Sequence, residues 1–137
     1  MGDACGRCSY CRTGQENLCT DFKATGRDAH GGYTEYMVVP ETSVFKIPSL
    51  FSDTEAAPLL CAGAVGYRSL LLCNMINGQC LGLMGFGASA HLVLKTAQYL
   101  YPDSPVCAFA RSAEERDFAM ELGCKWAGDI HEIPPEK

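Results

Sequence analysis

The stretch Cys80-Leu-Gly-Leu-Met-Gly-Phe-Gly-Ala-Ser-Ala90 decides the fold of this chain. Its first part, Cys80 to Met84, is a short apolar run of the length of a buried strand. Gly85-Phe-Gly87 then supplies a turn, and an apolar pattern with helical period runs from Ala88 to Tyr101. Strand, glycine turn and helix in this order predict one unit of an open α/β sheet.

The same alternation continues toward the C-terminus. Val106 to Ala110 predicts a second buried strand, and Ser112 to Leu122 predicts a second helix that starts with a capping Ser112. Lys125 to Ala127 predicts a third strand. The order strand–helix–strand–helix–strand is half of a doubly wound, Rossmann-type sheet, so a partial dinucleotide-binding domain is expected over residues 51–137.

The glycine turn is the first candidate binding site. In a G-x-G-x-x-G-like turn between strand and helix, the first glycine permits the turn and the second lets the backbone approach a pyrophosphate. The N–H groups at the start of the helix then face the phosphates. The alternative is a glycine turn that binds nothing. The candidate cofactor residues here are Gly85, Phe86, Gly87, Ala88, Ser89 and Ala90, in which Ala90 replaces the third glycine.

The choice of cofactor is expected at the end of the second strand. An NAD site has Asp or Glu there to bind the ribose 2′-hydroxyl, whereas this chain has Ala110-Arg111-Ser112. An arginine and a hydroxyl suit a 2′-phosphate, so Arg111 and Ser112 favour NADP(H). The alternative is that Arg111 is an ordinary surface arginine.

Two further patterns precede the α/β region. Ser52 and Glu55 form a capping box, and the apolar stretch Cys61 to Cys73 predicts a helix. Residues 31–48 alternate aromatic and β-branched residues with polar ones, which predicts two short strands that end at prolines.

Four cysteines near the N-terminus follow the pattern C-x2-C-x2-C-x7-C, at Cys5, Cys8, Cys11 and Cys19. Zinc prefers four thiolates in a tetrahedron, and four protein ligands leave no open position for a substrate. The spacing therefore predicts a structural zinc site. An iron–sulfur cluster is the first alternative, but the spacing differs from the ferredoxin patterns. Disulfide pairs are the second, and they require an oxidising compartment.

The other five of the nine cysteines are isolated in apolar surroundings, which is typical of small core residues. They are Cys61, Cys73, Cys80, Cys107 and Cys124.

Composition excludes several classes of protein. The 137 residues carry a net charge of −5, whereas a nucleic-acid-binding protein is expected to have a basic face. No apolar stretch approaches the ~18 residues of a membrane span, and the first twenty residues contain no secretory signal. A cytoplasmic location with reduced thiols is expected.

The cysteine lobe C-G-R-C-S-Y-C-R-T-G-Q-E-N-L-C, the following G-G-Y-x-E-Y segment at Gly31 to Tyr36 and the glycine turn occur in one order. In this they resemble the zinc-dependent medium-chain alcohol dehydrogenases. The resemblance implies the end of a GroES-like β-domain with the structural-zinc lobe over residues 1–50, followed by the partial Rossmann domain. It also implies an oxidoreductase that interconverts a small-molecule alcohol with its aldehyde or ketone.

The segment Glu55 to Gly63 is similar to the family segment that contributes the last protein ligand of a catalytic zinc, so the resemblance makes Cys61 that ligand. The family's other ligands come from Cys–His and Gly-His-Glu motifs, and no histidine here stands in such a context. The resemblance thus implies an incomplete chain, in which exposed sheet edges favour oligomerisation. The alternatives are a non-catalytic zinc-binding module and a thiol-redox protein that uses the C-x2-C pairs.

Overall fold

The computed structural model describes residues 2–135, and the chain divides into two compact units, one up to Ile47 and one from Pro48 onward. The first unit contains β1 (Gly2–Asp3), α1 (Ser9–Arg12), β2 (Lys23–Ala24) and short 3-10 helices at Glu16–Leu18 and Glu41–Ser43. The second contains α2 (Asp53–Ala56), a 3-10 turn at Ala57–Leu60, α3 (Ala62–Leu72), β3 (Leu81–Met84), α4 (Ala88–Leu100), β4 (Val106–Phe109), α5 (Ala113–Glu121) and β5 (Trp126–Gly128).

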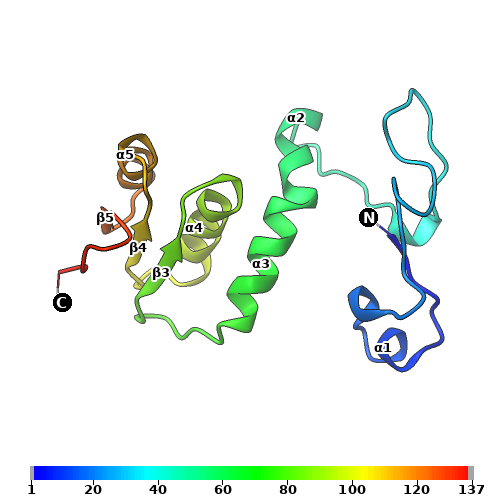
Figure 1. Ribbon diagram of the computed structural model, residues 1–137, viewed down its shortest axis with the longest axis horizontal. Coiled ribbons are helices and arrows are strands. Elements are labelled where there is room, and N and C mark those ends of the chain that lie inside the picture. Colours follow the sequence, from blue (N-terminus) through cyan, green and yellow to red (C-terminus); the bar gives the residue numbers. More distant parts are fainter. Residues whose placement is uncertain (1, 136–137) are drawn as a thin grey trace. The chain divides into compact units, whose positions relative to one another are not determined.

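The second unit is a parallel α/β layer (Figure 1). Its three strands lie in the order β3-β4-β5, all parallel, with Leu81 opposite Val106 and Cys107 opposite Trp126. Parallel neighbours need a helical crossover, and α4 and α5 provide the two crossovers. The predicted strand–helix–strand–helix–strand order is confirmed, and the fold is that of a partial Rossmann domain.

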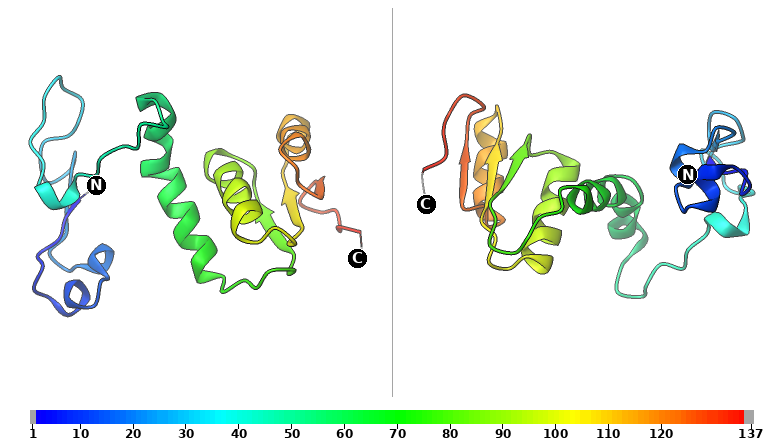
Figure 2. Two further views of the ribbon diagram at one scale, coloured as in Figure 1. Left: turned by 180° about the vertical axis from the view of Figure 1, so that it is seen from behind. Right: turned by 90° about the horizontal axis from the view of Figure 1, so that it is seen from below.

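One face of this sheet carries the core. Alternate residues of β4, including Val106 and Ala108, pack against Val93 and Leu94 of α4 and Ala119 of α5. Both crossover helices therefore cover the same face (Figures 1 and 2), as expected when two right-handed crossovers progress in one direction across a sheet.

The helix boundaries follow their local signals. Ser52 and Glu55 form the expected capping box at the start of α2, with the Ser52 N–H donating to Glu55 Oε2 at 2.9 Å. Ser112 caps α5 by accepting the N–H of Glu115 at 3.1 Å. Gly123 follows α5 with a φ of 97°, the left-handed backbone that ends many helices.

The two strands predicted within residues 31–48 are wrong. This segment is irregular apart from the 3-10 turn at Glu41–Ser43, and Tyr33, Tyr36, Val38 and Phe45 are all exposed. A strand requires a partner for its N–H and C=O groups, and among the described residues none pairs with this segment.

The expectation of buried cysteines holds for Cys107 and Cys124 only, because Cys61, Cys73 and Cys80 are exposed. The strand at Cys80–Met84 is likewise less buried than predicted. Met84 is exposed, on the sheet face that α4 and α5 do not cover.

Within the part of the chain that the structure describes, no helix has the length and apolar character needed to cross a membrane.

Candidate metal and cofactor sites

Cys5, Cys8, Cys11 and Cys19 come together in the first unit, with their four sulfurs all within 4.8 Å of one another. The Sγ atoms of Cys8 and Cys11 are 3.5 Å apart, and those of Cys5 and Cys11 are 4.0 Å apart. Tetrahedral zinc with Zn–S bonds of about 2.3 Å requires sulfurs roughly 3.8 Å apart, so the four thiols fit this ion. Within residues 2–135 they are the one set of three or more metal-ligating side chains that lie this close.

Backbone turns aim N–H groups at these sulfurs. The N–H of Cys8 donates to Cys5 Sγ and that of Cys5 to Cys19 Sγ, each at 3.4 Å. The backbone N–H groups of Arg7 and Cys8 lower the pKa of Cys5 to about 6, and that of Cys11 lowers the pKa of Cys8.

Burial has the opposite effect on the pKa of Cys11. Burial, and then the hydrogen bond with Cys8, raise the pKa of Cys11 to about 12. A divalent cation bound at this cluster would favour the thiolate form of its cysteines, Cys11 included.

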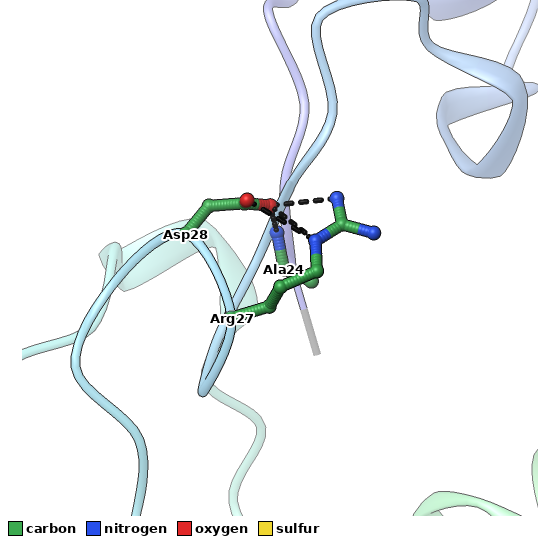
Figure 3. A network of polar contacts seen from close by, with 3 residues as sticks. All are labelled: Ala24, Arg27 and Asp28. Carbon is green, nitrogen blue, oxygen red and sulfur yellow. Dashed lines mark hydrogen bonds and ion pairs between the residues drawn. The ribbon is translucent and has the colours of Figure 1, made fainter.

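A loop after β2 adds a polar contact to the first unit (Figure 3). The Asp28 carboxylate accepts the Ala24 N–H at 2.7 Å and pairs with the Arg27 guanidinium, also at 2.7 Å. The hydrogen bond from Arg27, followed by that from Ala24, lowers the pKa of Asp28. Both side chains are partly exposed, so this ion pair orders the loop and contributes little to stability.

The glycine turn lies between β3 and α4. Gly85 has a φ of 90°, which favours glycine, and a Cβ at either Gly85 or Gly87 would meet nothing within 4 Å. The space next to both glycines is therefore open. The N–H groups of the first turn of α4, at Ala88, Ser89 and Ala90, have no intrahelical partner and are available to an anion there.

A groove of about 420 Å³ begins at this turn and reaches the end of β4. Of the predicted cofactor residues, it is lined by Gly85, Phe86, Gly87 and Arg111. Ser112 lies next to Arg111 in an adjoining hollow, and Glu115 borders both spaces. Met84, Phe109, Ala110 and Ile130 complete the lining and were not predicted.

Ser89 and Ala90 instead border a separate hollow toward α3. A Cβ on Gly66 of α3 would lie 3.5 Å from the Ser89 carbonyl oxygen, so this part of α4 is close to its neighbouring helix.

Arg116 is a further residue that the sequence reasoning missed. Its Nη1 donates to the carbonyl oxygens of Ala110 at 2.8 Å and Arg111 at 2.9 Å. One guanidinium therefore holds the backbone of the loop that presents Arg111. The only signal in the sequence is a basic residue one helical turn after the capping Ser112.

The predicted catalytic ligand Cys61 lies at the N-terminus of α3 and is exposed. In the described part of the chain it belongs to no set of three metal-ligating side chains, so the residues present do not complete a catalytic zinc site. His91 is not a ligand candidate, because its ring contacts the Gly87 carbonyl oxygen through Nδ1 at 3.4 Å and faces Phe118.

The first unit therefore contains a four-cysteine cluster suited to a structural zinc, and the second is a parallel βαβαβ unit with the glycine turn typical of dinucleotide-binding domains. Comparison with known proteins agrees. Residues 1–49 match the family model of the alcohol dehydrogenase GroES-like domain. The chain is thus similar to alcohol dehydrogenases over nearly its whole length, and its N-terminal part resembles their GroES-like domain.

Individual relatives cover nearly the whole chain. The Mycobacterium tuberculosis (strain CDC 1551 / Oshkosh) protein named "Probable alcohol dehydrogenase AdhA" is 47% identical over 131 residues, which are 96% of this chain and 37% of that protein. The solved alcohol dehydrogenase rspB from E. coli CFT073, complexed with NADH, has 27% identity and a TM-score of 0.84 over 97% of this chain and 39% of its own. CAD from Helicobacter pylori, complexed with NADP(H), has 29% identity and a TM-score of 0.81 over 92% of this chain and 38% of its own. The chain thus spans well under half the length of these relatives.

Proposed function

We propose that this chain supplies the structural-zinc lobe and the adenosine half of the cofactor site of an NADP(H)-dependent alcohol dehydrogenase. The observation that carries this proposal is the groove that leads from the glycine turn to Arg111. A bound nicotinamide cofactor would supply the hydride-transfer chemistry of such an enzyme. The part of the chain described here binds and orients the other end of that cofactor.

The charges at the far end of the groove support a 2′-phosphate. Arg111 lines the groove beyond Phe109 and Ala110, where the ribose of a dinucleotide bound at the glycine turn would lie. A guanidinium binds a phosphate through two parallel hydrogen bonds. The Glu115 carboxylate borders the same space and repels a phosphate there, so Arg111 and Glu115 have opposite effects on the preference for NADP(H).

The test is to measure the dissociation constants of NADPH and NADH for the wild-type chain and for Arg111→Asp. We expect Arg111→Asp to weaken the binding of NADPH by roughly tenfold or more, which is ~1.4 kcal/mol, and to weaken the binding of NADH much less. Glu115→Gln is the matched control and should strengthen NADPH selectively. Equal weakening of both cofactors by Arg111→Asp would remove the argument for NADP(H).

For the metal, we propose that Cys5, Cys8, Cys11 and Cys19 hold one structural zinc, which the spacing of their sulfurs supports. Cys61 stays a predicted ligand of a catalytic zinc, and we derive no reaction step from it. The second candidate function, a non-catalytic zinc-binding module, is favoured by the lack of a complete catalytic ligand set in residues 2–135. The number of zinc ions per chain, in protein purified under reducing conditions, separates the two candidate functions. One ion per chain fits the non-catalytic module, and two ions require that further ligands bind a second zinc together with Cys61.

Two properties of the whole protein also stay predictions. We infer a cytoplasmic location, supported by nine cysteines that are all free thiols. We infer self-association through the sheet edges, supported by β3 and β5 having no outer neighbour among the described strands.

A further inference from the structure

Two cysteines that are far apart in the sequence lie side by side in the second unit. The Sγ atoms of Cys80 and Cys107 are 3.7 Å apart, although 27 positions separate the residues. Cys80 comes directly before β3, and Cys107 in β4 is opposite Gly82. Because side chains alternate along a strand, Cys80 and Gly82 have the same facing, and the two thiols meet on one side of the sheet.

The two thiols differ in access to solvent. Cys80 is exposed, whereas Cys107 is only 6% exposed. Burial, and then the hydrogen bond with Cys80, raise the pKa of Cys107 to about 11, so Cys107 stays a neutral thiol at pH 7. An outside reagent therefore meets Cys80 first, and Cys107 waits next to it. An exposed thiol with a buried neighbour is the arrangement of an attacking and a resolving cysteine.

We propose that Cys80 and Cys107 form a reversible thiol–disulfide site whose co-reactant is a small-molecule disulfide such as oxidised glutathione. The Cys80 thiolate attacks one sulfur of that disulfide, the S–S bond breaks, and one small thiol leaves. Cys107 then loses its proton and attacks the Cys80 sulfur, which expels the second small thiol and forms the Cys80–Cys107 bond. The two cysteines are oxidised by two electrons, and the small disulfide is reduced to two thiols.

The second step is favoured by the geometry. The two sulfurs already lie 3.7 Å apart, and this short distance makes the attack of Cys107 on a modified Cys80 effectively unimolecular. Cys80 precedes the strand, so the backbone that must move to shorten the sulfur–sulfur distance is not part of the β3 ladder.

The bond would join the residue before β3 to the neighbouring strand β4. The closed loop contains β3, Gly85, Gly87 and α4, and the bond lies at the opposite end of β3 from the glycine turn. Oxidation would therefore restrain the unit without covering the groove that leads to Arg111. The proposal does not depend on which cofactor, if any, the groove binds.

The test is to treat the chain with oxidised glutathione, quench with iodoacetamide and map the cysteine-containing peptides by mass spectrometry. We expect a Cys80–Cys107 linkage in the wild type and a glutathione adduct that persists on Cys80 in Cys107→Ser. The linked form should melt about 5 °C or more higher, and dithiothreitol should reverse the change.

Cys73 is the internal control. It is exposed like Cys80, and within the described residues no other cysteine sulfur lies within hydrogen-bonding distance of it. It should remain a glutathione adduct in every variant. The proposal is overturned if wild-type Cys80 also stops at the adduct, or if Cys80 does not react while Cys73 does.

Discussion

At the scale of single residues, the loop after β4 depends on two arginines with different tasks. Arg111 faces the groove, while Arg116 donates hydrogen bonds to the carbonyl oxygens of Ala110 and Arg111 and so holds the backbone. Arg116 is a positioning residue, because its effect on a cofactor would pass through Arg111. The bond to the Ala110 carbonyl is partly buried and has a charged donor, which is among the stronger kinds of hydrogen bond in proteins.

We expect Arg116→Ala to weaken the binding of NADPH about tenfold, which is ~1.4 kcal/mol, and to change the binding of NADH little. In a chain that already carries Arg111→Asp, the same substitution should have little further effect on NADPH, because the residue it positions is gone. Arg116→Lys should recover part of the loss, since an ammonium group reaches one carbonyl at a time. Titration of all four variants with both cofactors checks this, and additive effects of the two arginine substitutions would contradict it.

These two arginines also show what the sequence can predict about a site. The place of Arg111 beside the groove was predictable, because the end of the second strand is a fixed place in a Rossmann unit. Its role in the choice of cofactor stays a prediction. The role of Arg116 was not predictable, because it depends on two carbonyl groups that turn toward its side chain only in the folded loop. Glu115, whose N–H donates to the capping Ser112, was not predictable as a charge on the groove, for the same reason.

At the scale of secondary-structure elements, the start of α2 gives a pH-dependent prediction. Ser52 donates to the Glu55 carboxylate through Oγ at 2.7 Å and through its backbone N–H at 2.9 Å, and the side-chain bond followed by the backbone bond lowers the pKa of Glu55. A carboxyl group with a depressed folded pKa stabilises the fold above its unfolded pKa, about 4.3, and this contribution is lost as the pH falls through the folded pKa.

We therefore expect the NMR titration midpoint of Glu55 to lie below that of an unperturbed glutamate in the wild type and to rise in Ser52→Ala, which removes the hydroxyl but keeps the backbone donor. Ser112→Ala is the control, because it removes the cap of α5 and should leave the Glu55 midpoint where it is. An unchanged midpoint in Ser52→Ala would show that the hydroxyl does not set the pKa of Glu55.

The crossing of α3 and α4 depends on one glycine. A Cβ on Gly66 would lie 2.6 Å from Cγ2 of Val93, too close for any real contact. Alanine has the higher helix propensity by about 1 kcal/mol, but overpacking of a tight helix contact costs ~1–3 kcal/mol. We expect Gly66→Ala to lower the free energy of unfolding measured by urea denaturation.

A second substitution isolates the steric cause of that loss. Val93→Ala removes the clashing methyl group, so Gly66→Ala should cost less in that background than in the wild type. Equal costs in the two backgrounds would show that Val93 does not limit the approach of α3 to α4.

Elements were predictable where their signals are local. The caps of α2 and α5, and the glycine turn after β3, depend on residues a few positions apart, and all lie where the sequence indicated. The strands expected within residues 31–48 failed because alternation of side chains predicts a face and not a partner. The partner strand is a property of distant sequence, and none is paired here among the described residues.

At the scale of the whole molecule, the two units have different sources of stability. The second has a continuous core between sheet and helices. In the first, Cys19 is the only buried side chain among the described residues, and it is one of the four clustered cysteines. A unit with so little buried apolar surface needs another source of folding energy, and a metal bound by four thiolates is such a source.

We therefore expect chelation to unfold the first unit selectively. Removal of zinc under reducing conditions should release close to one ion per chain, and amide hydrogen exchange should become fast up to Ile47 while β3, β4 and α4 stay protected. Cys8→Ser should reproduce this state without a chelator, because it removes one of the four clustered thiols. Cys73→Ser, at an exposed position on the second unit, is the matched control and should keep both the zinc and the protection.

Unchanged zinc content in Cys8→Ser would refute the four-thiolate site. Loss of protection in both units together would instead mean that the second unit needs the zinc lobe in order to fold, despite its own core.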